Sequence, residues 1–456
     1  MNKKLLLFFL CCSTMFLAQG KITQEQLSEI RNSFKPTSAQ KAVINAVTTN
    51  GISKSAFNRE NAGKTDHFFK YRVDVKGITD QKSSGRCWMF TSMNMIRPKI
   101  IKNLNLSGFE FSTNYLFFWD QFEKSNLTLQ TFIDTRDKEF NNKRVEILFR
   151  GPIGDGGVWS MFADISQKYG LVPKEVMPET YNSEKTSIMR KFLKRKLREG
   201  GLAIRRAHEK GESLSKLEEI KIGVLKDIYR ILVVSLGEPP VEFQWRYKSK
   251  DNKVSSLRTY TPLSFYKEYA ESQFENYVML MDDPTRPYYK LYEIENDRDL
   301  YEGKNWKYIN LPADQIKKYA IASIKANEAM YFSCDVGKQI DRKNGVLSVD
   351  NYDYESLFGV KFGMDKKDRI LTRESGSSHG MALVGVDVDN QGKPVQWLLE
   401  NSWGKSSGHN GYLTMTDKWF DEYMFRVVVL KKFVDKKTLE LLKSEVEMLP
   451  PWDPMF

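Results

Sequence analysis

Helical and strand patterns occupy different parts of this 456-residue chain. Between residues 186 and 235, apolar side chains recur every three or four positions, which is the spacing of an amphipathic helix. Later in the chain, four short apolar runs are separated by turns rich in glycine, asparagine and aspartate, at 381–386, 395–399, 412–415 and 427–430. Because helices precede strands instead of alternating with them, the sequence predicts an α+β fold and not a doubly wound sheet.

The first twenty residues differ in composition from the rest of the chain. Lys3 and Lys4 are followed by an apolar run over 5–17, and residues 18–20 (Ala-Gln-Gly) have the small-residue pattern of a cleavage site. This pattern predicts a signal peptide over 1–20, with a membrane anchor as the alternative. No later stretch is apolar and long enough to cross a bilayer, so we expect a periplasmic or secreted protein without stable membrane association. If the signal is not cleaved, the alternative is a cytoplasmic protein.

Beyond that segment the chain keeps two cysteines, Cys87 and Cys334. Exported proteins normally pair their cysteines as disulfides, but these two lie far apart in the sequence and have unlike surroundings. Cys87 follows a serine and glycine turn at the start of a helical pattern, whereas Cys334 ends an apolar strand pattern. We therefore predict a reactive thiol at Cys87 and an inert core thiol at Cys334. With four histidines and no cysteine cluster, we expect neither a metal nor a cofactor.

The turn before Cys87 has the features of a nucleophile site. A cysteine at a helix start faces unpaired backbone N–H groups and the positive end of the helix dipole, and both favour the thiolate. Gly85 allows the chain to turn tightly there. The amide of Gln81 can donate to an oxyanion that forms beside the sulfur, with the Cys87 N–H as the second donor. Loss of one such donor typically raises the barrier by about 3 kcal/mol.

The sequence resembles the papain-like cysteine peptidases in several ordered motifs. The first motif is Gln81 with the glycine turn, Cys87 and Trp88. A histidine before one strand and an asparagine after the next form two more, in Ser378-His379-Gly380-Met381 and Glu400-Asn401-Ser402-Trp403-Gly404. In this family the loop that pairs with the substrate backbone is matched here by Asp155-Gly156-Gly157. The resemblance implies a two-lobed papain-like fold with a helical lobe and an antiparallel β lobe.

Under this resemblance each site residue has a chemical role. A peptide carbonyl is a poor electrophile, so His379 would take the proton of Cys87 and stabilise the thiolate as an ion pair. Asn401 would hydrogen-bond the other imidazole nitrogen and fix the tautomer, as an aspartate does in serine enzymes. Trp403 would shield that bond from water, and its alternative role is core packing alone. An acyl-enzyme would form on the sulfur, and water would release it.

The spacing of the motifs indicates one branch of that family. In papain the histidine and asparagine come about 130–150 residues after the cysteine, whereas His379 follows Cys87 by 292 residues. The chain is most similar to the bleomycin hydrolase and aminopeptidase C branch, over nearly its whole length after the signal. The similar segments include those at 155–159, 168–174, 178–181, 261–267, 334–338 and 451–455.

Similarity to that branch implies an activity and an assembly. Its members are typically homohexamers that enclose their active sites, and the basic helical segment would be the hook that grips neighbouring subunits. Their C-terminus runs into the cleft, where the terminal carboxylate, here that of Phe456, would pair with the free ammonium group of a peptide. The implied function is a cysteine-type aminopeptidase that acts on peptide substrates.

Two other functions are compatible with the sequence. Relatives usually continue a few residues past the Asp-Pro-Met segment, so a tail that ends at Phe456 reaches less far. The first alternative is therefore a papain-type endopeptidase with an unrestricted cleft. The net charge of +12, much of it in the helical segment, motivates a nucleic-acid-binding relative as the second. Since that segment lacks interleaved aromatics, a solvated or inter-subunit helix face is the better interpretation.

The predicted domain order follows from these motifs. The segments are a signal peptide at 1–20, an N-terminal arm at 21–75, a catalytic helical lobe at 76–185, a basic helical insertion at 186–240, a family-specific insertion with the start of the β lobe at 241–374, a catalytic β lobe at 375–435, and a C-terminal arm at 436–456 that enters the cleft.

Overall fold

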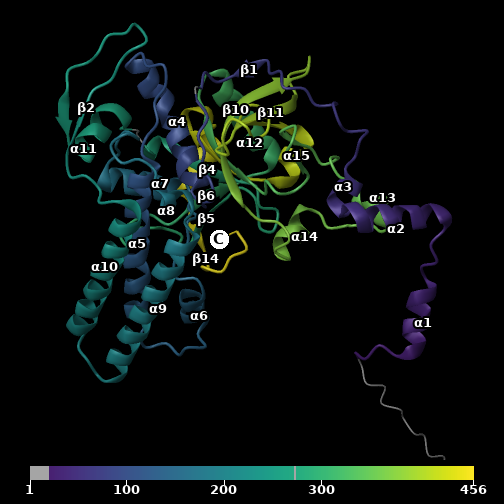
Figure 1. The fold of residues 1–456 in the computed structure, drawn as a ribbon, viewed down its shortest axis with the longest axis horizontal. Helices are drawn as coiled ribbons and strands as arrows, with labels where there is room; N and C mark the ends of the chain where they lie inside the picture. Colours follow the sequence, from purple (N-terminus) through teal and green to yellow (C-terminus); the bar gives the residue numbers. More distant parts are fainter. Residues whose placement is uncertain (1–19, 76, 272–273, 456) are drawn as a thin grey trace, which may run out of the picture. The chain divides into compact units, whose positions relative to one another are not determined.

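The computed structural model describes residues 20–75, 77–271 and 274–455 (Figure 1). The predicted signal peptide, apart from its last residue, therefore lies outside the described residues. Within those ranges, none of the helices has both the length and the apolar character that crossing a membrane requires. The described chain forms two compact units.

The smaller unit comprises the residues up to Phe57 together with Asp353–Val360. Its helices are α1 (Gln24–Asn32), α2 (Ser38–Asn50), α3 (Ile52–Ala56) and α13 (Tyr354–Phe358). Thr23 and Thr37 begin α1 and α2 with capping boxes, in which the threonine and a glutamine three residues later each satisfy a backbone N–H of the other. Local cap chemistry therefore defines where these two exposed helices start.

The larger unit begins at Asn58 and contains the remaining helices. They are α4 (Cys87–Asn103), α5 (Thr113–Asp134), α6 (Lys143–Arg150), α7 (Trp159–Tyr169), α8 (Tyr181–Glu184), α9 (Ser187–Glu209), α10 (Leu214–Leu236), α11 (Pro262–Phe265), α12 (Ala313–Lys325), α14 (Lys366–Leu371), α15 (Asp417–Tyr423) and α16 (Lys436–Glu440). Helix α4 starts at Cys87 as predicted, and Pro98 lies inside it. Buried isoleucines on both sides of the proline offset the backbone hydrogen bond that it cannot make.

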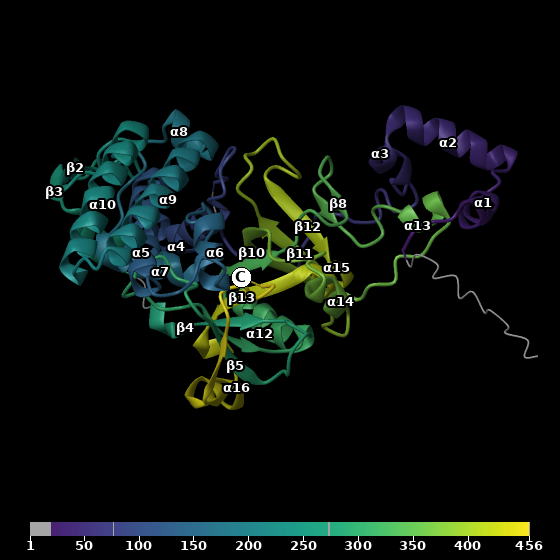
Figure 2. The ribbon, with the colours of Figure 1, turned by 90° about the horizontal axis from the view of Figure 1, so that it is seen from below.

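Helices α5, α9 and α10 lie side by side in both views (Figures 1 and 2). The basic segment predicted to be helical thus forms two helices, α9 and α10, joined by a turn. Two glycines of α9 allow the close approach. A Cβ atom on Gly201 would lie 2.6 Å from the ring of Phe132 in α5, and one on Gly200 would lie 2.9 Å from Leu129.

The larger unit also contains the sheet that positions the site. Its strands are β1 (Tyr71–Arg72), β4 (Tyr277–Met281), β5 (Lys290–Ile294), β6 (Lys307–Asn310), β7 (Met330–Cys334), β8 (Ile340–Asp341), β9 (Val346–Leu347), β10 (His379–Val388), β11 (Pro394–Glu400), β12 (Tyr412–Thr416), β13 (Met424–Leu430) and β14 (Val446–Leu449). Their order is β14-β5-β6-β4-β13-β7-β10-β11-β12-β9-β8, and β1 pairs with β10. A separate hairpin joins β2 (Phe243–Trp245) and β3 (Arg258–Tyr260).

The four strands predicted near the C-terminus are confirmed as β10, β11, β12 and β13. The fold is α+β, as predicted. The expectation of a purely antiparallel sheet is wrong, because β4 pairs with β6, β5 with β14 and β9 with β12 in parallel. Apolar periodicity identifies a strand but not its partner, so these pairings could not be read from the sequence.

Helix α4 packs against β10, and this contact brings distant motifs together. Cys87 is the first residue of α4 and His379 is the first residue of β10. Cys334 ends β7, which pairs with β10, and it is fully buried. Both cysteines are free thiols in the described chain. The predicted contrast between a nucleophile position and a core position is therefore present in the fold.

The close packing of α9 against α5 predicts the effect of one added methyl group. Gly201→Ala should lower the free energy of unfolding by about 1–3 kcal/mol, because the new Cβ atom would overlap the buried Phe132 ring. Gly223→Ala in α10 is the matched control, since its Cβ atom would meet nothing within 4 Å. The control should stabilise the protein by about 0.5–1 kcal/mol. Urea denaturation measures both values, and equal effects would contradict the packing argument.

Candidate active site

The sulfur of Cys87 lies at the N-terminal end of α4 and is half-buried. The backbone N–H of Gly380 donates to Sγ at 3.5 Å, and the N–H of Trp88 also donates to it. The imidazole of His379 lies near enough to the sulfur to lower the pKa of the thiol. The helix start and the N–H of Gly380 in β10 therefore supply backbone hydrogen-bond donors to the sulfur.

Asn401 orients the ring of His379. It directly follows Glu400, the last residue of β11, which pairs antiparallel with Ala382 near the start of β10. His379 Nε2 lies 2.8 Å from Asn401 Oδ1, and both side chains are buried. The N–H of Ser402 also donates to Oδ1 at 2.8 Å, which fixes that atom as an acceptor. Nε2 must then carry a proton, and Nδ1 is the nitrogen left for the sulfur.

Electrostatics around Cys87 favour its thiolate. Burial raises the pKa of the thiol, but the neighbouring imidazole of His379 and the two backbone N–H groups lower it by more. The net pKa of Cys87 lies below its ordinary value. In contrast, burial without such partners raises the pKa of Cys334 well above its ordinary value.

Gln81 is tied to the segment that carries Asn401. Its backbone N–H donates to the carbonyl of Ser402 at 2.8 Å, and the Ser402 hydroxyl donates to Gln81 Oε1 at 2.7 Å. Gln81 Nε2 donates one hydrogen to the carbonyl of Ser84 at 2.7 Å. Because its oxygen is fixed by the serine, the amide nitrogen has a defined direction, and its second hydrogen remains for another acceptor.

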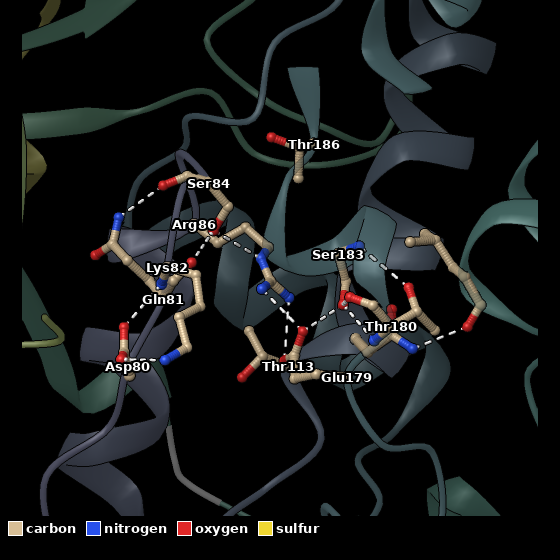
Figure 3. A network of polar contacts seen from close by, with 12 residues as sticks. Asp80, Gln81, Lys82, Ser84, Arg86, Thr113, Glu179, Thr180, Ser183 and Thr186 are labelled. Carbon is tan, nitrogen blue, oxygen red and sulfur yellow. Dashed lines mark hydrogen bonds and ion pairs between the residues drawn. The ribbon is translucent and has the colours of Figure 1, made fainter. Parts of the chain in front are cut away.

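A buried arginine holds the turn before Cys87 (Figure 3). Arg86 is fully buried and pairs with Glu179 at 2.9 Å, and its Nε donates to the Ser84 hydroxyl at 3.1 Å. Its guanidinium also lies over the ring of Phe90 at 5.2 Å. A buried charge is tolerated only when it is paired, so Arg86 fixes this turn to the helices behind it.

A second buried ion pair joins α4 to β11 beside Asn401. Arg97 Nη2 lies 2.5 Å from Glu400 Oε1 and also donates to the carbonyl of Gly77 at 2.6 Å. Glu400 immediately precedes Asn401 in the sequence. This pair therefore connects the helix that begins with Cys87 to the strand that carries the orienting asparagine.

The glycine-rich loop forms one wall of the site. A Cβ atom on Gly157 would lie 2.6 Å from the indole of Trp88, and one on Gly85 would lie 2.8 Å from the Cβ of Asp155. Trp88 Nε1 donates to the carbonyl of Asp155 at 2.8 Å, and Gly85 N–H donates to its carboxylate at 3.1 Å. Only glycine fits at these two contacts, so the loop lies directly against the residues that flank Cys87.

These groups line a cavity of about 1110 Å³. Its walls include Gln81, Cys87, Gly156, Gly157 and His379. Trp403 does not line the cavity. Its ring stacks on the imidazole of His379, with ring centroids 4.8 Å apart. The described residues contain no cluster of three or more histidine, cysteine or acidic side chains arranged to hold a metal.

The last described residues reach the same cavity. Pro451 lines it, as does Arg426, whose Nη2 donates to the carbonyl of Met455 at 2.6 Å. Asp453 pairs with Arg286 at 2.8 Å, which anchors the tail. In both views the C-terminal segment runs between the helices and the sheet (Figures 1 and 2). Phe456, the predicted ligand for the substrate ammonium group, lies outside the described residues.

The model of one protein family, described as the Peptidase C1-like family, matches residues 21–456. The chain belongs to this family. Aminopeptidase C of Streptococcus thermophilus is 37% identical over 416 residues, which are 91% of this chain and 94% of that protein. Bleomycin hydrolase of Homo sapiens is 39% identical over 423 residues, 90% of this chain and 93% of that protein.

A solved structure is also similar to this chain over nearly its whole length. The crystal structure of PepW from Lactobacillus rhamnosis HN001 has a TM-score of 0.92 and 36% identity to this chain, with 96% of this chain and 99% of that one covered. The present chain is therefore a cysteine-type peptidase of the bleomycin hydrolase and aminopeptidase C type.

In this C1-like peptidase the structure gathers most of the residues selected from the sequence and adds others. Ser402, Arg86 and Lys124 were not predicted. Ser402 orients Gln81, Arg86 holds the turn, and Lys124 Nζ donates to the carbonyl of Gly156 at 2.6 Å. The only sequence signal for Arg86 was its position between the glycine turn and the cysteine. Nothing in the sequence indicated Lys124, because its contacts depend on how α5 packs.

The lowered pKa of Cys87 predicts a specific alkylation profile. The rate of its reaction with iodoacetamide should be half-maximal at a pH below about 8.5, which is the ordinary pKa of a cysteine thiol. In His379→Ala that midpoint should move to higher pH, because burial then raises the thiol pKa without the imidazole to oppose it. Mass spectrometry of the labelled peptide measures the rate. Cys334 should stay unlabelled as an internal control, and an unmoved midpoint would contradict the role given to His379.

Proposed function

We propose that Cys87, His379, Asn401 and Gln81 form the catalytic site of a cysteine-type aminopeptidase. The observation that carries this proposal is the hydrogen bond of 2.8 Å between His379 Nε2 and Asn401 Oδ1. It leaves Nδ1 for the thiol of Cys87, whose pKa is lowered. The helices and the sheet of the larger unit would correspond to the two lobes of a papain-like fold, with α9 and α10 inserted.

Acylation begins with transfer of the thiol proton of Cys87 to His379. The thiolate attacks the carbonyl carbon of the scissile bond, and the carbonyl π electrons move to oxygen. The tetrahedral oxyanion then collapses, the C–N bond breaks, and the imidazolium gives its proton to the leaving amine. Asn401 keeps the ring in one orientation through both proton transfers. Water activated by the imidazole hydrolyses the thioester and restores the thiol.

Gln81 would stabilise the oxyanion together with the N–H of Cys87. The second hydrogen of Gln81 Nε2 is available, and Gln81 lines the same cavity as the sulfur. A donor fixed before the reaction costs no reorganisation when the charge develops. Trp403, stacked on His379, would keep water from the bond between His379 and Asn401. Gly156 and Gly157 would present backbone groups to the substrate.

The position of the tail supports an exopeptidase over an endopeptidase. Residues 450–455 are held at the cavity by Arg286 and Arg426, so a long chain could not pass through unhindered. We expect a carboxylate at this end of the cleft to pair with the ammonium group of a peptide.

Kinetics on aminoacyl fluorogenic substrates test this function. Leucyl-aminomethylcoumarin should be cleaved with a kcat/KM at least about tenfold higher than its N-acetyl form, because only the free amine gains the charged contact. Cys87→Ala should abolish both activities without loss of folding. Equal rates on the free and blocked substrates would instead favour an endopeptidase with an unrestricted cleft.

We also propose that the chain forms a homo-oligomer, specifically a homohexamer. The exposed side chains on α9 and α10 support it, since Phe192 is 54% and Val234 is 81% exposed. These helices would be the contact surface, which also accounts for their basic charge without nucleic acid. Light scattering on the purified protein measures the mass, and a monomer at micromolar concentration would refute this assembly.

Export is the proposed location, on the pattern of residues 1–20 alone. A positive start, a short apolar run and small residues at a cleavage site support it. N-terminal sequencing of the protein from cell fractions tests it. An intact N-terminus in the cytoplasm would contradict it.

A further inference from the structure

Asp297 lies in the active-site cavity but has no part in the mechanism above. It follows β5 and lines the same cavity as Cys87 and His379. Only 7% of the residue is exposed. Among the described residues, its carboxylate accepts no hydrogen bond and forms no ion pair. Its neighbour Glu295 differs, because Glu295 is paired with Arg144.

The two cations that lower the pKa of Asp297 have contacts with other groups. Arg426 donates to the carbonyl of Met455 at 2.6 Å and lies over the ring of Trp306 at 3.6 Å. Lys124 pairs with Asp120 at 2.7 Å and donates to the carbonyl of Gly156. Both influence Asp297 electrostatically without contacting it. The carboxylate oxygens are therefore free to accept hydrogen bonds from a group in the cavity.

Tyr331 is a third cavity residue that responds to the charges of both Asp297 and Cys87. Burial raises the pKa of the Tyr331 phenol, and the charges of Cys87 and Asp297 each raise it further, so the phenol lies within electrostatic reach of both. A Cβ atom on Gly380 would lie 3.1 Å from the Tyr331 hydroxyl, and the N–H of Gly380 donates to the sulfur. Asp297 and Tyr331 line the same cavity as Cys87, together with Arg426, which holds the tail.

The charge of Asp297 is unusual for its setting. Burial raises its pKa to about 6, against the opposing charges of Arg426 and Lys124, so the group is mainly a carboxylate at neutral pH. A buried carboxylate without hydrogen bonds is unfavourable. A cation that enters the cavity would supply the missing donors, and such charge-assisted contacts are among the stronger hydrogen bonds.

We propose that Asp297 is a specificity-determining residue whose carboxylate binds an ammonium or guanidinium group of the substrate. The proposal rests on the peptidase function above and deepens it. Two sources share this chemistry: the α-ammonium group of the first residue, and the cationic side chain of a lysine or arginine at that position. A purely structural role, in which Asp297 only balances the charge of Arg426, makes a different prediction for substrate preference.

The ratios of kcat/KM between pairs of substrates, measured with the Asp297→Asn variant, distinguish these roles. The substrates are leucyl-, lysyl- and N-acetyl-leucyl-aminomethylcoumarin. If the α-ammonium group is bound, the preference for leucyl over N-acetyl-leucyl substrate should fall by about tenfold or more. If the side-chain cation is bound, the preference for lysyl over leucyl substrate should fall by a similar factor. Both substrates of each ratio are assayed with the same enzyme preparation. A partial loss of folded protein then lowers both rates by the same factor and leaves the ratio unchanged.

Glu295→Gln is the matched control. Glu295 lines the same cavity but is already paired with Arg144, so both ratios should stay unchanged in this variant. Asp297→Glu keeps the charge and should retain most of the affected preference. If Asp297→Asn leaves both ratios unchanged, or if Glu295→Gln lowers them equally, Asp297 is not a substrate ligand and the proposal is overturned.

A binding measurement separates failure of this proposal from failure of the peptidase function. Calorimetry on Cys87→Ala with leucinamide, lysinamide and N-acetyl-leucinamide requires no turnover. In the double variant Cys87→Ala/Asp297→Asn, the binding affinity for leucinamide or lysinamide should fall by about tenfold relative to that for N-acetyl-leucinamide. Selective loss would support the cation site even if the wild-type enzyme cleaves none of the test substrates. Equal binding of the three amides in Cys87→Ala, unchanged by Asp297→Asn, would overturn it whatever the enzyme cleaves.

Discussion

The packing of the start of α4 against the start of β10 is the contact on which the site depends. It places the sulfur of Cys87 against the N–H of Gly380 and beside the imidazole of His379, although the two motifs lie far apart in the sequence. A thiol buried in this way without partners would be harder to ionise, as Cys334 illustrates. The lowered pKa of Cys87 is therefore a property of the junction and not of the helix alone.

Buried charges surround this junction, and most of them are paired. Arg97 joins α4 to the strand before Asn401, and Arg86 fixes the turn before the nucleophile. Removal of one partner from such a pair leaves a buried charge, which typically costs about 3–5 kcal/mol. Such pairs define the geometry of the turn and of the strand end more than they add net stability. Asp297 stands out against this background, because its charge is left to face the cavity.

Close contacts at glycines complete the framework. Gly157 lies against Trp88, Gly85 lies against Asp155, and Gly201 lies against Phe132. At each position a methyl group would approach its neighbour more closely than packed atoms allow. The same requirement recurs at the turn before the nucleophile, in the loop that forms a wall of the cavity, and in the helices far from the chemistry.

The sequence by itself determined the α+β class, the strands near the C-terminus, the helix start at Cys87 and the motifs around His379 and Asn401. Each follows from local periodicity or from a short ordered motif, so no distant contact is needed to recognise it. Only the tertiary structure decided the parallel strand pairs, the ion pair of Arg86 and the free carboxylate of Asp297 in the cavity. These depend on which surfaces meet after folding, and periodicity along one segment carries no information about its partner.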